Sequence, residues 1–223
     1  MSTSCTLDDV RAALSLPDFD GFGAQRQMMP AGRPVGRAGE GATAPRLGGV
    51  LLLLYCVDEK LHLVLTRRPD YDGVHSGQIS FPGGRHEPPE TLEMTALRET
   101  HEEIGILPAD VELLGGLTPL FVVPSNFEVH PFVGRYMRNK RPVFAPDTRE
   151  VAAILEVSLQ LLLDPATRVE EEMELRGGLR LRVPCFRVGR QRVWGATAMI
   201  LSEFLQRLNY VKLIREHGLR VVD

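Results

Sequence analysis

Three glutamates within five residues are the part of this chain whose residue types and spacing most readily support chemistry: Glu99, Glu102 and Glu103. At about 100° per residue on a helical wheel, they fall within roughly 100° of one another, so a helix would present them on one face. Like charges three or four residues apart destabilise a helix unless something neutralises them. Carboxylate oxygens are ligands that Mg²⁺ or Mn²⁺ prefers, and the alternative interpretation is a solvated acidic face.

The residues around these glutamates predict the helix that would carry them. Apolar side chains gather on the opposite side of the wheel and are expected to pack: Met94, Leu97 and Ile104. Gly105 is a natural C-terminal stop, and the pair Pro88-Pro89 suits a first helical turn. The pair Gly83-Gly84 precedes the helix, which suggests close approach of the backbone to a metal or a phosphate.

The wider spacing follows a longer pattern. Gly84 is followed after five residues by Glu90 and after seven more by the run from Arg98 to Ile106. This pattern resembles the Nudix box of the Nudix hydrolases. Thr100 departs from it, because the family prefers an aliphatic residue there, but Thr100 lies at the edge of the apolar arc and leaves the acidic face intact.

The resemblance implies roles for residues of the box. The catalytic group would be Arg98, Glu99, Glu102 and Glu103. The last three would ligate Mg²⁺ or Mn²⁺, with the carbonyl of Gly84 as an additional ligand. Glu90 and Arg98 would orient the catalytic glutamates, and they can pair directly only if Arg98 extends back along the helix.

The group that takes the proton from the attacking water is left open. Glu99 is one candidate. Carboxylates outside the box are others, namely Glu150 and one of Glu170, Glu171 and Glu172. Each of these outer residues also fits a solvated surface charge.

A second stretch resembles the motif that precedes the box in coenzyme A-hydrolysing Nudix proteins. It consists of Leu65-Thr66-Arg67-Arg68 and the run from His75 to Gly84. The resemblance implies substrate contacts by a set of residues in this stretch: Arg67, Arg68, His75, Gly77 and Gln78. Two positions depart from the motif, because Pro69 replaces a small residue and Gly73 replaces an arginine that could hold a phosphate.

Composition limits the remaining possibilities. Hydrophobic residues at 43%, charged residues at 25% and a formal charge of −3 are ordinary for a globular protein and give no electrostatic case for nucleic acid. The longest apolar run, Val50 to Val57, is too short for a membrane span, and the N-terminus does not read as a signal peptide. Three widely spaced cysteines favour reduced thiols in the cytoplasm. The chain is expected to be a monomer or a homodimer.

The order of predicted elements indicates an α+β fold with a mixed β-sheet, and the resemblance implies the α/β/α sandwich of the Nudix fold. Residues 1–46 are expected to form an N-terminal helix, capped by Thr6, and an extended segment that is mostly loop from Asp18. Residues 47–210 would be the Nudix domain and 211–223 a C-terminal tail.

Three functions remain in competition. The first is metal-dependent hydrolysis of the diphosphate of coenzyme A or acyl-CoA, which would give adenosine 3′,5′-bisphosphate and 4′-phosphopantetheine or its acyl form. The second keeps the metal site but changes the substrate to ADP-ribose or another nucleoside diphosphate derivative, as the departures at Pro69 and Gly73 allow. The third is a non-catalytic nucleotide sensor, which would have no need for three crowded carboxylates.

Overall fold

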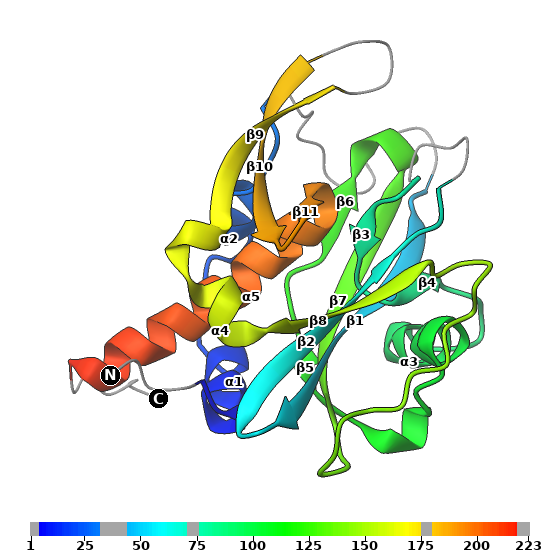
Figure 1. Cartoon of the computed structure of the whole chain (residues 1–223), viewed down its shortest axis with the longest axis horizontal. Coiled ribbons are helices and arrows are strands. Elements are labelled where there is room, and N and C mark those ends of the chain that lie inside the picture. Colours follow the sequence, from blue (N-terminus) through cyan, green and yellow to red (C-terminus); the bar gives the residue numbers. More distant parts are fainter. Residues whose placement is uncertain (1–4, 32–43, 71–75, 175–179, 218–223) are drawn as a thin grey trace.

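The computed structural model describes residues 5–31, 44–70, 76–174 and 180–217 (Figure 1). Its helices are α1 Leu7–Leu14, α2 Gly21–Arg26, α3 Leu92–Ile104, α4 Leu159–Leu163 and α5 Gly195–Glu216, with short 3-10 turns at Pro108–Asp110, Val123–Ser125 and Pro165–Thr167. Its strands are β1 Arg46–Val57, β2 Lys60–Arg67, β3 Ile79–Ser80, β4 Gly83–Arg85, β5 Val111–Gly116, β6 Leu120–Val122, β7 Phe127–Tyr136, β8 Ala153–Ser158, β9 Arg168–Glu174, β10 Arg180–Val188 and β11 Gln191–Trp194.

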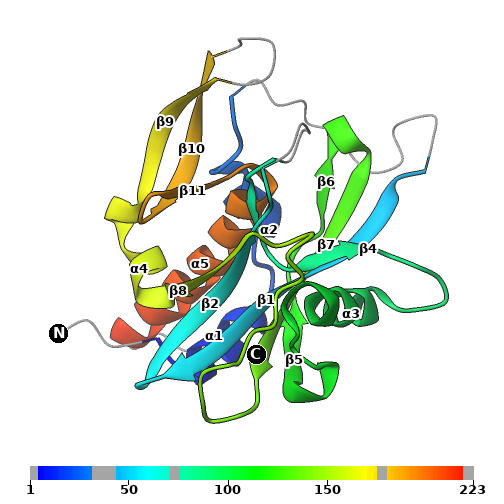
Figure 2. The ribbon, with the colours of Figure 1, turned by 45° about the vertical axis from the view of Figure 1, so that its right-hand side comes forward.

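The main sheet lies between α3 on one face and α5 on the other (Figure 2). Its strand order is β3–β2–β1–β7–β5, with β4 paired to β1, β6 to β7 and β8 to β2. The pair β1–β7 is parallel and its neighbours are antiparallel, so the sheet is mixed. A smaller sheet, β11–β10–β9, packs beside α5. The predicted α+β fold with an α/β/α sandwich is confirmed.

Strand β1 forms the middle of the core. Leu51 and Leu53 pack with the α3 side of the sheet, whereas Leu52 and Leu54 pack with the α5 side, and none of the four is exposed. The continuous apolar run of β1 is therefore buried on both faces of the sheet, which explains why it does not alternate with polar residues. Each such leucine contributes on the order of 2 kcal/mol by leaving water.

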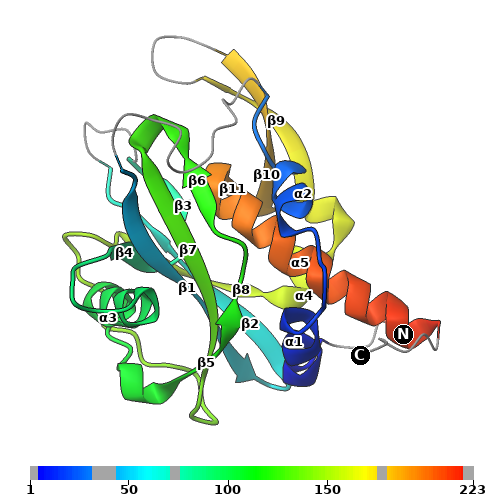
Figure 3. The same ribbon diagram turned by 180° about the vertical axis from the view of Figure 1, so that it is seen from behind.

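The N-terminal helices pack along α5 (Figure 3). As predicted, Thr6 caps α1, and its hydroxyl oxygen accepts a hydrogen bond from the Asp9 amide. The segment from Asp18, which was expected to be mostly loop, contains the six-residue helix α2, capped by Asp20. Helix α5 continues to Glu216, so the start of the segment 211–223 is helical. No helix in the described ranges is both long and apolar enough to cross a membrane.

Helix α3 lies unusually close to β1. A Cβ built on Gly49 would stand 2.4 Å from the Leu92 carbonyl oxygen and 3.0 Å from the Ala96 nitrogen. Of the three side chains expected to pack, Ile104 is buried and Leu97 packs against the core, but Met94 is 56% exposed. The small side chain of Ala96 is buried at the contact instead. Small side chains suit this contact because the two backbones nearly touch, and the longer Met94 points away from it.

Replacing Gly49 with alanine should therefore force α3 away from β1. We expect Gly49→Ala to lower the free energy of unfolding by about 1–3 kcal/mol, as overpacking does in other cores. Urea denaturation measures this change. Gly116→Ala is the matched control, because its Cβ would meet nothing closer than 3.7 Å, and it should stay within about 0.5 kcal/mol of the wild type. Equal stability of the two variants would contradict the close contact.

Candidate active site

The ends of α3 are fixed by local interactions. The hydroxyl oxygen of Thr91 caps the helix by accepting a hydrogen bond of 3.3 Å from the Met94 amide. Pro88 and Pro89 precede this cap, so the prediction that they form the first helical turn was wrong. Gly105 ends the helix in the left-handed conformation with φ 76°, as predicted.

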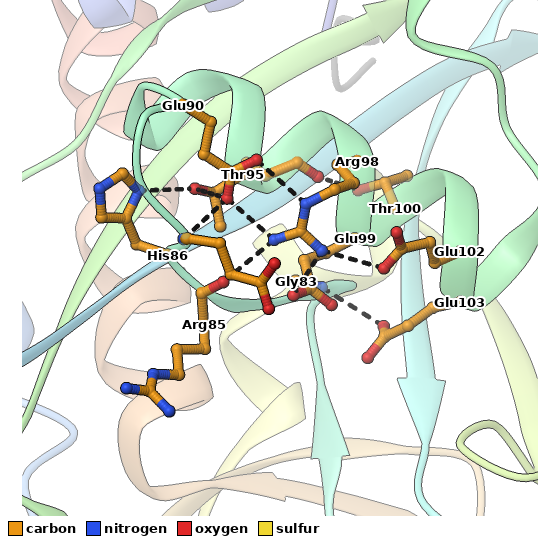
Figure 4. Close-up of polar contacts among 12 residues, drawn as sticks. Gly83, Arg85, His86, Glu90, Thr95, Arg98, Glu99, Thr100, Glu102 and Glu103 are labelled. Carbon is orange, nitrogen blue, oxygen red and sulfur yellow. Dashed lines mark hydrogen bonds and ion pairs between the residues drawn. The ribbon is translucent and has the colours of Figure 1, made fainter.

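Arg98 connects the carboxylates of the site (Figure 4). Its Nε and Nη2 donate to the two carboxylate oxygens of Glu90 at 3.0 and 2.9 Å, so Arg98 extends back along the helix as the direct pairing requires. Its Nη1 donates to Glu99 and to Glu102, both at 3.0 Å. Nη2 also donates to the carbonyl of Arg85 on β4 at 3.1 Å. One guanidinium therefore fixes three carboxylates relative to the sheet.

The hydrogen bonds between Arg98 and Glu90 shift the pKa values of both groups so that each stays charged. The hydrogen bonds from Arg98 hold the pKa of Glu90 at about 2, and the hydrogen bonds to Glu90 raise the pKa of Arg98 above its usual range. Burial raises the pKa of Glu99, although Arg98 opposes the shift. Glu90 and Arg98 are thus charged partners at neutral pH.

Glu103 differs from its neighbours because Arg98 does not reach it. Its side chain is buried, with 5% of its surface exposed, and it accepts a hydrogen bond of 3.3 Å from the Gly83 amide. Burial raises the pKa of Glu103 to about 7, opposed by the positive charge of Arg68 and by that hydrogen bond. Glu103 is therefore a buried carboxylate whose charge is only partly compensated.

The donor set suits a divalent cation. A Cβ on Gly84 would stand 2.4–2.5 Å from the Glu99 carboxylate, so glycine leaves the backbone of β4 open to that group. Carboxylates and a main-chain carbonyl are oxygen ligands of the kind Mg²⁺ takes. Among the described residues, no three acidic, histidine or cysteine side chains already surround a common point. Glu99 and Glu102 instead face Arg98, and Glu103 has the carboxylate that would gain most from a cation.

Of the acidic residues outside the box, the structure brings Glu150 near the site. The loop before it bonds to the end of α3, with the Asp147 amide 3.0 Å from the Glu103 carbonyl and the Ala145 amide 3.0 Å from the Ile104 carbonyl. The charge of Glu150 raises the pKa of both Glu99 and Glu103.

The other three acidic candidates do not fit. Glu170, Glu171 and Glu172 lie on β9, in the smaller sheet beside α5, on the opposite side of the molecule from α3 (Figure 2). Glu171 is paired with Arg187. The interpretation of these residues as candidate bases is therefore wrong, because the main sheet separates them from the box.

The predicted substrate residues are arranged around the end of β2. The Arg68 amide donates to the Gln78 carbonyl at 3.0 Å, and Gly77 has the positive φ of 64° that favours glycine. Arg67 is engaged by Asp70, with hydrogen bonds of 2.7 and 2.8 Å. His75 and Gly73 lie outside the described residues. Arg68 is close enough to the acidic helix for its charge to lower the pKa of Glu103, whereas Arg67 is paired with Asp70.

Two residues that sequence reasoning overlooked also contact the site. Thr95 is completely buried, and its hydroxyl donates a hydrogen bond to Glu90. The same hydroxyl is hydrogen-bonded to His86 Nδ1. The available signal was the helical spacing, because Thr95 lies one turn before Glu99 on the same helix.

Comparison with known proteins agrees with this geometry. A family model described as NUDIX domain matches residues 46–174. The chain is 37% identical over 161 residues to a Yersinia enterocolitica protein named "Uncharacterized Nudix hydrolase NudL", covering 72% of this chain and 80% of that protein. The Yersinia pestis protein of the same name is 36% identical over 165 residues, covering 74% and 80%.

A solved structure supports the fold. The crystal structure of a Nudix hydrolase from M. smegmatis, RenU, aligns with a TM-score of 0.51 at 15% identity, covering 76% of this chain and 86% of that one. The chain belongs to the Nudix hydrolase family. Within that family it is a hydrolase of a substrate that contains a pyrophosphate linkage.

The burial of Glu103 predicts how stability depends on pH in metal-free protein. Its pKa is about 7 in the folded chain against an ordinary value of 4.5, so the folded state holds the proton more tightly. The resulting stabilisation is complete below about pH 4.5 and is lost as the pH rises through about 7. Relative to Glu103→Gln, the wild type should lose on the order of 3 kcal/mol across that window, measured by urea denaturation in EDTA.

Glu93→Gln is the control for this measurement, because Glu93 is an exposed carboxylate on the same helix. It should follow the wild type at every pH. Parallel curves for the wild type and Glu103→Gln would contradict the raised pKa of Glu103.

Proposed function

We propose that this protein hydrolyses the diphosphate linkage of coenzyme A or an acyl-CoA in a reaction that depends on Mg²⁺ or Mn²⁺. The products would be adenosine 3′,5′-bisphosphate and 4′-phosphopantetheine or its acyl form. The substrate would be a small nucleotide derivative, with no nucleic acid or membrane partner. We also propose a cytoplasmic location, which agrees with three free cysteines.

The observation that carries this proposal is that the stretch with Arg68 and the box meet. The Arg68 amide bonds to Gln78 at the end of β2, and a few residues later the Gly83 amide donates to Glu103 of the box. Arg68 belongs to the stretch that resembles the motif of coenzyme A-hydrolysing Nudix proteins, and Glu103 belongs to the box. The positive charge of Arg68 lowers the pKa of Glu103, which requires the two groups to be near each other. A guanidinium next to a carboxylate cluster suits a diphosphate, which the guanidinium would contact directly and the carboxylates only through a bound cation.

The residues of the site have separate tasks in this proposal. A divalent cation held by Glu99, Glu102, Glu103 and the Gly84 carbonyl would neutralise the diphosphate and orient a water molecule. Arg98 and Glu90 would hold the carboxylates in position. Glu99 and Glu150 are the remaining candidates for the group that takes the proton from water, since both lie at the acidic end of the site.

ADP-ribose or a related nucleoside diphosphate derivative is the second candidate substrate. It is favoured by Pro69 and Gly73, which stand where the motif has a small residue and an arginine. The two substrates differ in the 3′-phosphate of coenzyme A, which ADP-ribose lacks. A site without the arginine could therefore accept either one.

The proposal is tested by product analysis with Mg²⁺ or Mn²⁺ and, in separate reactions, coenzyme A, acetyl-CoA and ADP-ribose. We expect adenosine 3′,5′-bisphosphate from coenzyme A, detected by chromatography and mass spectrometry. Glu103→Gln should lower kcat by at least about a hundredfold, because several kcal/mol of transition-state stabilisation depend on the cation. Glu93→Gln on the exposed side of α3 should retain wild-type turnover.

The outcomes separate the alternatives. Turnover of ADP-ribose alone would keep the metal-dependent chemistry and reject coenzyme A as the substrate. Full activity of Glu103→Gln would reject the metal site. Binding of coenzyme A without any product at either metal would favour the nucleotide sensor.

A further inference from the structure

The hydroxyl of Thr95 links Glu90 to His86, a residue to which the proposed mechanism gives no role (Figure 4). The hydroxyl of Thr95, on α3, lies 2.8 Å from a carboxylate oxygen of Glu90 and 3.1 Å from Nδ1 of His86. Thr95 is completely buried, and His86 is half-buried in the turn between β4 and α3. The backbone of His86 is fixed as well, because its amide donates to the Leu47 carbonyl on β1 at 2.9 Å.

The direction of these hydrogen bonds follows from the single proton of the Thr95 hydroxyl. Its possible acceptors are the Glu90 carboxylate at 2.8 Å and the Thr91 carbonyl at 3.1 Å. The shorter bond to the ionised group is the stronger one, so the hydroxyl donates to Glu90. Its oxygen then accepts a hydrogen bond from His86 Nδ1–H.

Glu90 is thereby held from several sides. The oxygen that accepts from Thr95 also accepts from the Glu87 amide at 2.9 Å and from Arg98 Nη2 at 2.9 Å, and the second oxygen accepts from Arg98 Nε at 3.0 Å. Because Arg98 binds Glu90 with two nitrogens, the plane of the guanidinium is set by the carboxylate. That plane directs Nη1 to Glu99 and Glu102.

We propose that Thr95 and His86 are positioning residues of the active site, which act through Glu90 and Arg98 on the orientation of Glu99 and Glu102. In this proposal neither residue would contact the substrate. The inference rests on the proposed function, because it gives these two residues a task in that same site.

A purely structural role for a buried threonine on this helix is represented by Thr100. Its side chain is also fully buried, but its hydroxyl donates to the Ala96 carbonyl at 2.6 Å, within the helix itself. Thr100→Val therefore removes a buried hydroxyl from the same helix without touching Glu90. It is the matched control for Thr95→Val, which keeps the shape of the side chain and removes the hydrogen bonds of its hydroxyl with Glu90 and His86.

The experiment compares kinetics and one spectroscopic signal. With the diphosphate that the wild type hydrolyses, Thr95→Val should lower kcat by on the order of tenfold with KM within about twofold, whereas Thr95→Ser and Thr100→Val should stay within about twofold of the wild type. In metal-free protein, the ¹⁵N–¹H signal of Arg98 Nε, assigned by its loss in Arg98→Lys, should shift or broaden in Thr95→Val and remain in place in Thr100→Val.

Wild-type kcat and an unchanged Arg98 signal in Thr95→Val would overturn the proposal, as would an equal loss of kcat in Thr100→Val. If thermal unfolding shows that Thr95→Val does not fold, the second variant is His86→Ala, which alters only a half-buried side chain. A shifted Arg98 signal in His86→Ala would support the positioning role, and an unshifted signal would reject it. A wild type that hydrolyses no diphosphate would reject the proposed function, and the Arg98 signal would still test the positioning role.

Discussion

Three carboxylates on neighbouring turns of one helix repel one another, and the Arg98 guanidinium lies between two of them and a fourth carboxylate, that of Glu90. The guanidinium can offset the repulsion between these carboxylates only if it is itself held in place. Glu90 and the Arg85 carbonyl provide that hold from the segment before α3, and the close contact of α3 with Gly49 keeps the helix against the sheet. The geometry of the acidic face thus depends on a charge network and on a glycine in the core strand.

The same network explains why the glutamates are not equivalent. Glu99 and Glu102 share Arg98, whereas Glu103 is buried beside Gly83, and Arg68 acts on it only through its charge. A buried carboxylate with partial compensation is costly in an empty site and becomes favourable when a cation is bound. In the proposed metal site, burial of Glu103 would therefore lower the stability of the free protein and favour binding of a cation.

Much of the fold and of the box could be predicted from the sequence, because helical spacing fixes which glutamates share a face and because the run Leu51–Leu54 can only be buried on both sides. The exposure of Met94 could not be predicted, since it depends on how closely α3 approaches β1 at Gly49. Long-range placement was also out of reach. Glu150 and Glu171 are both acidic residues outside the box, and only the topology puts the first near α3 and the second in the other sheet.

We propose that the carboxylates of α3, together with Gly84, hold a divalent cation. Anomalous diffraction from crystals soaked in Mn²⁺ tests it most directly, because the metal is located without any assumption about the substrate. A peak bounded by Glu99, Glu102, Glu103 and the Gly84 carbonyl, about 2.1 Å from the ligand oxygens, is the expected result. Mn²⁺ bound elsewhere, with no peak beside Glu103, would contradict this.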